Sequence, residues 1–237
     1  RGLMLKAGNA FDVIDLDQGK EINESAENLI GLLTPILKSF ATDKAMEITN
    51  HALQIYGGHG YITDHGMEQL VRDARITPIY EGTNGIQALD LVGRKMGAHM
   101  GRYLRRFFHP VSQFIEENQS NTDLQEFLFP LAKSFAKLQQ STAIIAQKGL
   151  KNPLEAGAAS TNYLRQFALV AMGFMWIQMA KVAQEKLSEG AENKEFYEAK
   201  VKTARFFFAR MLPETDWHFK AVMSGADSLM EMNEKEF

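Results

Sequence analysis

Apolar residues recur at helical spacing along most of the chain. The first stripe, over residues 3–14, predicts an amphipathic helix that Gly19 closes. Residues 20–33 are more mixed and predict a loop with a short helix. A longer stripe begins at Pro35, since a proline suits the first turn of a helix, and it ends at Gly57. The first quarter of the chain therefore predicts two helices joined by a loosely ordered connection.

Glycine-rich stretches divide the next part of the chain. Residues 57–66 hold four glycines and predict a tight, irregular connection, which a short helix follows. Residues 76–85 predict a loop that contains Glu81. A long helix is expected to start near residue 84 and to run to residue 109, because Pro110 should kink or end it.

The second half of the chain predicts a separate helical bundle. A polar linker at residues 116–123 precedes a wide apolar stripe. The helix predicted over residues 156–187 is apolar on nearly all sides, so we expect it to be the buried core element of this half. A last long helix is predicted over residues 195–212, and strand signals are nearly absent. The predicted fold is all-α, with one helical bundle over residues 1–110 and a second over residues 111–237.

Composition narrows the possible functions. The 237 residues include 26 basic and 29 acidic side chains and no cysteine. A disulfide framework, a thiolate zinc site and a cysteine nucleophile are excluded, and no basic stripe typical of a nucleic-acid binder is evident. The densest apolar run, Phe167–Ile177, is too short to cross a bilayer, which takes about 20 residues, so no transmembrane segment is predicted.

The histidines do not predict a metal site. His51, His59 and His65 lie close together in the sequence, but no pair has the i, i+4 spacing of a helical zinc motif. Exposed or hydrogen-bonded histidines are the favoured interpretation. The glycines of residues 57–60 could cradle a phosphate through backbone N–H groups, but a helix end followed by a turn is favoured there too.

Glu81 is the strongest candidate for chemistry. It lies in a loop with Ile76, Ile79 and Tyr80, and Gly82 follows it. A carboxylate in apolar surroundings is a suitable general base, and a neighbouring glycine lets a substrate approach the backbone. The alternative is an exposed loop glutamate that stabilises the start of the next helix, and the residues alone favour this alternative.

Three motifs in order, within about 45 residues, resemble the C-terminal region of acyl-CoA dehydrogenases. They are QIYGGHGY at residues 54–61, RDAR at residues 72–75 and IYEGT at residues 79–83. From about residue 110 onward, the chain is similar to the extra helical domain of one subgroup of that family. One motif alone would be a weak signal, but the three together are specific.

The resemblance implies an FAD-dependent oxidation of an acyl-CoA thioester to the trans-2-enoyl-CoA. Glu81 matches the family's base, which removes the α-proton while a hydride leaves the β-carbon for the flavin N5. Gly82 matches a position that touches the substrate. The positions that match FAD contacts are Gln54, Ile55, Tyr56, Gly57, Gly58, Thr83, Asn84 and Gly85.

The resemblance also implies partners and a location. The segment 54–58 usually reaches the cofactor of a neighbouring subunit, so a homo-oligomer is expected. Electron-transferring flavoprotein is the expected electron acceptor. The bacterial cytoplasm and the mitochondrial matrix would both suit such an enzyme.

The sequence departs from the family in two ways. Gly85 stands where many relatives have a glutamine, and Gly93 replaces a common arginine, with Arg94 beside it. Nothing resembles the family's N-terminal helical domain or its middle β-domain, and the chain begins with Arg1 in an apolar pattern. We therefore expect a C-terminal fragment that does not bind FAD or catalyse alone. The alternative is a non-catalytic helical module for binding or assembly.

Overall fold

The computed structural model describes residues 1–236, and every regular element in that range is helical. This confirms the all-α prediction. The α-helices are α1 (Gly2–Asp15), α2 (Lys20–Ile55), α3 (Gly58–Tyr61), α4 (Met67–Arg75), α5 (Asn84–Asp90), α6 (Arg102–Glu117), α7 (Gln125–Gly149), α8 (Pro153–Ser188), α9 (Lys194–Phe206), α10 (Glu214–Met223) and α11 (Asp227–Met230). Short 3₁₀ or π turns cover Thr63–His65, Leu91–Lys95, Ala98–Gly101, Thr122–Leu124, Phe207–Met211 and Glu234–Glu236.

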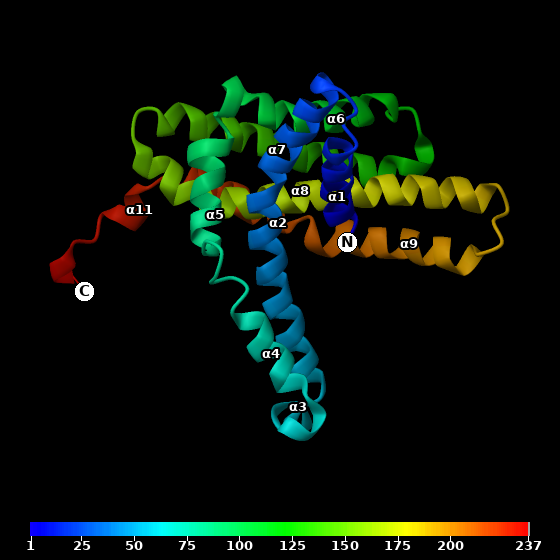
Figure 1. The fold of residues 1–237 in the computed structure, drawn as a ribbon, viewed down its shortest axis with the longest axis horizontal. Helices are drawn as coiled ribbons and strands as arrows, with labels where there is room; N and C mark the ends of the chain where they lie inside the picture. Colours follow the sequence, from blue (N-terminus) through cyan, green and yellow to red (C-terminus); the bar gives the residue numbers. More distant parts are fainter. Residues whose placement is uncertain (237) are drawn as a thin grey trace.

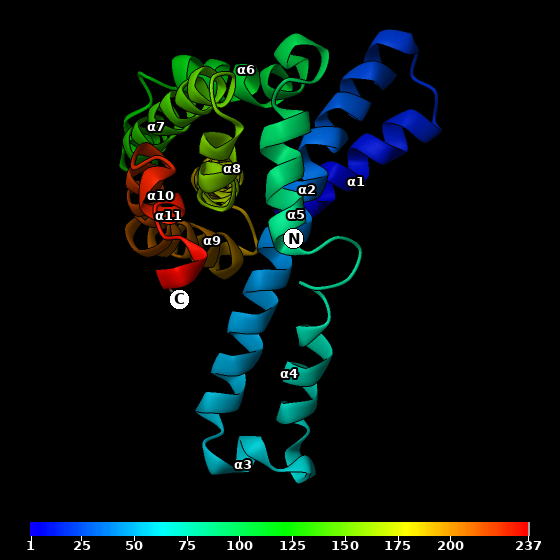
Figure 2. The same ribbon diagram turned by 90° about the vertical axis from the view of Figure 1, so that its left-hand side faces the viewer.

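Helix α8 is the centre of the molecule. It packs against α7, α9 and α10 on one side and against α2 and α5 on the other (Figure 1, Figure 2). Its length and composition would allow it to cross a membrane, but 61% of its most apolar window is buried inside the protein. The prediction that residues 156–187 form a buried core helix is confirmed.

An arm projects from this body. It consists of the second half of α2 together with α3 and α4, and it extends well below the other helices (Figure 1, Figure 2). Several apolar residues of the arm are exposed, among them Ile48, Ile55 and Tyr61. The loop predicted over residues 76–85 is confirmed for residues 76–83, which lead from the arm back to the body, whereas its last two residues begin α5.

The predicted loop over residues 20–33 is wrong, because α2 runs through it without a break and takes Pro35 into its interior. Leu32, Leu33 and Ile36 are almost completely buried around that proline. Burying three large aliphatic side chains contributes several kcal/mol, which outweighs the roughly 3 kcal/mol cost of an interior proline. Tertiary packing therefore overrides the local signal for a helix start.

The predicted single helix from residue 84 to residue 109 is also wrong. The chain leaves α5 through a π turn and bends sharply at His99 and Met100, whose φ angles are 47° and 55°, so that α6 runs crosswise to α5 (Figure 1). Helix α6 then starts at Arg102 and passes through Pro110, which is exposed. The boundary predicted at residue 110 thus lies inside a helix, and the division into two bundles stays a prediction.

Candidate functional site

Glu81 lies in the loop between α4 and α5 in a strained backbone conformation. Its φ angle is 54°, and that of Gly82 is 83°. A left-handed conformation costs a residue with a side chain roughly 1–2 kcal/mol. Such strain persists only where the surroundings impose it, and it concentrates at functional sites. The carboxylate of Glu81 is exposed, which differs from the apolar surroundings considered for it above.

Hydrogen bonds within the loop impose this conformation. The backbone N–H of Tyr80 donates to the Ile76 carbonyl (3.1 Å), and that of Asn84 donates to the Pro78 carbonyl (3.1 Å). The Gln87 side chain donates to the Glu81 carbonyl (3.2 Å). The loop backbone is therefore held on both sides of the glutamate.

A polar network fixes the loop to α2. Lys38 Nζ donates to the carbonyl of Gly82 (2.7 Å) and to Asn84 Oδ1 (2.9 Å). Asn84 Nδ2 donates in turn to Thr42 Oγ1 (3.0 Å) and Asp43 Oδ1 (2.7 Å). These groups are partly buried, where hydrogen bonds involving charged groups contribute about 1.5–3 kcal/mol each. The position of Glu81 is thus determined by side chains more than 35 residues earlier in the chain.

The network continues into the second half of the chain. Arg165 of α8 donates to Asp43 Oδ2 (3.2 Å). Beyond it lies His218 of α10, whose Nδ1 is 3.1 Å from Asn162 Oδ1. Burial, followed by weaker repulsion from Arg165, lowers the pKa of His218 below its ordinary value, although nearby Glu214 opposes the shift. The loop that carries Glu81 is therefore linked through α2 to the core around α8.

The surface next to Glu81 is an open depression of about 570 Å³. Gly82, Ile86 and Leu89 line it together with the carboxylate. Within residues 1–236, the backbone N–H of Glu81 donates to no acceptor. A proton acceptor and a free N–H donor thus lie on the same residue, at the edge of a partly apolar depression.

The positions that match FAD contacts fall into two groups. Thr83, Asn84 and Gly85 adjoin Glu81, and the Thr83 side chain accepts from the Ile86 N–H (3.3 Å). Residues 54–58 lie at and just beyond the C-terminal end of α2. Gln54 follows Asp43, which holds Asn84, by eleven residues, or about 17 Å along the helix. The structure therefore does not bring the two groups together.

The two groups differ in their freedom to hold a cofactor. The segment 54–58 is exposed, and added side-chain atoms at Gly57 or Gly58 would meet nothing within 4 Å. The side-chain amide and the backbone N–H of Asn84 are used inside the protein. The open segment 54–58 and the exposed Gly85 fit an external group, whereas the Asn84 side chain does not.

His59 and His65 come together in the arm, with ring centroids 5.3 Å apart. In the part of the chain that the structure describes, no three histidine, cysteine or acidic side chains gather as a metal site would require. Lys38, Asp43 and Arg165, which form the network, were not predicted from the sequence. Their only signal was the presence of charged positions inside apolar helices.

Gly82→Ala is expected to lower the free energy of unfolding by about 1–2 kcal/mol. Position 82 has a left-handed backbone, and an added Cβ would lie 2.9 Å from Gln87 Nε2. Gly85→Ala is the matched control, because its Cβ would meet only Thr83 Oγ1 at 4.0 Å in the first turn of α5. The control should be neutral or stabilising by up to about 1 kcal/mol. Urea unfolding measures both, and equal effects would contradict the backbone argument.

Two known protein families match parts of this chain, and one of the matched ranges contains the loop of Glu81. Residues 16–97 match the family described as "Acyl-CoA dehydrogenase, C-terminal domain", and residues 107–233 match "Acetyl-CoA dehydrogenase C-terminal like". The chain belongs to the acyl-CoA dehydrogenase family. The Glu81 loop and the end of α2 both lie in the first matched range.

Individual acyl-CoA dehydrogenases are similar along nearly the whole chain. The 3-methylmercaptopropionyl-CoA dehydrogenase of Ruegeria pomeroyi is 32% identical over 97% of the chain. The broad-specificity linear acyl-CoA dehydrogenase FadE5 of Mycobacterium tuberculosis is 29% identical over 87% of it. The chain spans 39% and 35% of the lengths of these two relatives.

A solved acyl-CoA dehydrogenase has the same fold. The structure of Caenorhabditis elegans ACDH-11 in complex with C11-CoA superposes with a TM-score of 0.67 over 89% of the chain, at 20% identity. The match covers 34% of that longer chain. At this identity the likeness concerns the helical architecture.

Proposed function

We propose that this chain supplies the catalytic base of an FAD-dependent acyl-CoA dehydrogenase, which converts an acyl-CoA to the trans-2-enoyl-CoA. The observation that carries the proposal is the geometry of Glu81. Its strained backbone is held by a network from α2 and α8, and its carboxylate is exposed above a depression. A free carboxylate on a fixed backbone is what proton abstraction needs.

The residues of the loop have distinct roles in this reaction. The Glu81 carboxylate takes the α-proton of the thioester. The N–H of Glu81 donates to the thioester oxygen, where negative charge develops as the proton leaves. Gly82, which carries no side chain, leaves room for the substrate, and Lys38 holds its carbonyl. FAD, when bound, accepts the hydride that leaves the β-carbon.

Two places on the chain would hold FAD. Gly85 and the start of α5 meet the cofactor used by Glu81. The exposed segment 54–58 lies about 17 Å away along α2, so it meets the cofactor of a neighbouring subunit in a homo-oligomer. The acceptor of the electrons is electron-transferring flavoprotein. The location is the bacterial cytoplasm or the mitochondrial matrix.

Residues 1–237 alone are expected to fold but not to catalyse. The depression beside Glu81 is open, so water has access to the carboxylate, and a general base for so weak an acid needs exclusion of water. The purified chain should be helical and colourless, and it should not reduce a dye when acyl-CoA and FAD are added. Stoichiometric FAD binding by this chain would contradict the expectation.

The complementary experiment uses the longest natural polypeptide that contains this chain. With a saturated acyl-CoA and a dye, we expect trans-2-enoyl-CoA, identified by mass spectrometry, in step with dye reduction. If that polypeptide folds and binds FAD but forms no enoyl product with acyl-CoAs of short, medium and long chains, the helical module without catalysis becomes the better explanation.

A further inference from the structure

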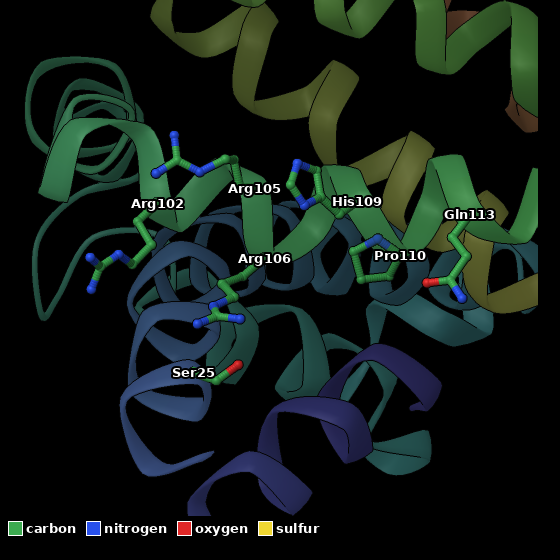
Figure 3. Close-up of a pocket in the computed structure, with 7 residues that line it drawn as sticks. All are labelled: Ser25, Arg102, Arg105, Arg106, His109, Pro110 and Gln113. Atoms are coloured by element: carbon green, nitrogen blue, oxygen red, sulfur yellow. The ribbon is translucent and has the colours of Figure 1, made fainter. Parts of the chain in front are cut away.

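A basic pocket lies between α6 and the start of α2 (Figure 3). Its volume is about 400 Å³. Helical spacing places Arg102, Arg106 and His109 on one face of α6. Arg105 also lines the pocket, but its side chain extends away from Arg106 in Figure 3. Arg106 points toward Ser25 of α2 in Figure 3. Among the residues that the structure describes, no acidic residue lines this pocket.

The positive charge of the pocket is only partly balanced. Arg102 forms an ion pair with Glu24. Within residues 1–236, Arg105 and Arg106 have no carboxylate partner, and Arg105 donates only to the Met100 carbonyl (2.9 Å). Arg106 Nε is buried and has no acceptor among the described residues. A buried N–H of a cation without an acceptor is costly, and an anionic ligand beside Arg106 would reduce that cost.

The fold does not explain why the arginines cluster here. Like charges three or four residues apart destabilise a helix by about 0.2–0.5 kcal/mol per pair. Cations are also unfavourable near a helix N-terminus, and the first turn of α6 carries no acidic residue and no side-chain cap. Apart from Arg102, which pairs with Glu24, these arginines have no carboxylate partner among the described residues that would offset this cost.

An apolar pocket of about 420 Å³ adjoins the basic one, and Ser25 and Arg106 line both. Its other walls come from α1 and α2 and include Val13, Ile22 and Leu29. Glu21, the acidic residue in that lining, is exposed. A ligand that fills both pockets would have an anionic head beside the arginines and an apolar part between α1 and α2.

From these observations the structure assigns an organic-phosphate site to the two pockets. A guanidinium group binds phosphate through two parallel hydrogen bonds, and Arg106, which has no carboxylate partner, lies where the two pockets meet. Ser25 lies 18 residues before Asp43 on α2, about 27 Å along the helix from the network that holds Glu81. The site is therefore separate from the loop of the proposed base and does not depend on its role.

Calorimetric titration with inorganic phosphate, hexyl phosphate and CoA tests the assignment. Hexyl phosphate should bind more tightly than inorganic phosphate, because its chain enters the apolar pocket. The double variant Arg105→Gln/Arg106→Gln should weaken its binding at least about tenfold, as expected for lost charged hydrogen bonds. The same loss for CoA would identify CoA as the source of the phosphate. Unchanged CoA binding beside lost hexyl phosphate binding would identify a different phosphate ester.

A matched control keeps the test specific. Lys194→Gln/Lys202→Gln removes the same charge from α9, where both side chains are exposed (72% and 73%), and should leave binding unchanged. If the arginine double variant does not fold, the single variant Arg106→Gln replaces it. Absence of hexyl phosphate binding, or an equal loss in the lysine control, would overturn the assignment.

Discussion

Phe167→Ala is expected to lower the free energy of unfolding by about 3–5 kcal/mol, the usual range for truncation of a buried aromatic residue. Phe167 is completely buried in the middle of α8. Its ring centroid is 4.9 Å from that of Phe107 and 6.0 Å from that of Phe108, both on α6. Tyr163 contacts it edge-on from one turn earlier in α8. The substitution would therefore leave a cavity where α8 meets α6.

Urea unfolding followed by circular dichroism measures this effect. Phe129→Ala is the matched control, since it removes the same atoms from a side chain of α7 that is 73% exposed. The control should change the unfolding free energy by less than about 0.5 kcal/mol. A melting temperature unchanged within a degree for Phe167→Ala would mean that α8 is not the core helix.

The helices that bury a continuous stripe could be predicted from the sequence, whereas the breaks between helices could not. Helix α8 has so little polar surface that its burial follows from composition alone. In α2, Pro35 predicted the start of a helix. The helix instead continues on both sides of Pro35, because burial of Leu32 and Ile36 stabilises it there. At residues 97–101 the bend between helices depends on left-handed residues, two of which are not glycines.

The sequence identified the position of Glu81 but not how it is held. Motif and loop composition both pointed to Glu81 and Gly82. The residues that fix them, Lys38 and Asp43, look like ordinary polar positions of a helix until folding brings them to Asn84. Long-range hydrogen bonds of this kind have no periodic signal in the sequence.

The basic cluster was missed for a related reason. With residues 84–109 taken as one helix, Arg102, Arg105 and Arg106 lay in its last turns, where cations are favourable. Because the chain bends sharply before residue 102, the same arginines stand at the start of α6, and Arg106 points toward α2. The place where the helix is interrupted therefore decides whether these arginines lie at the C-terminal end of a helix, where they would stabilise it, or at its N-terminal end, where they do not.

Glu81→Gln is expected to slow flavin reduction by at least about 100-fold in the FAD-bound enzyme that contains this chain. Glutamine keeps the size and polarity of the side chain but cannot take a proton. The bonds that hold the loop involve the carbonyls of Glu81 and Gly82 and the side chain of Asn84, so the substitution leaves them in place. Acyl-CoA should therefore still bind. Glu47→Gln, an exposed change on α2, is the matched control and should have no effect.

The most direct test of Glu81 as the base is anaerobic stopped-flow mixing of the oxidised enzyme with acyl-CoA. The unmodified protein and Glu47→Gln should lose the flavin absorption band rapidly. Glu81→Gln should bind the substrate and keep the band on that time scale. Near-normal bleaching in Glu81→Gln would contradict the assignment and remove Glu81 from the mechanism.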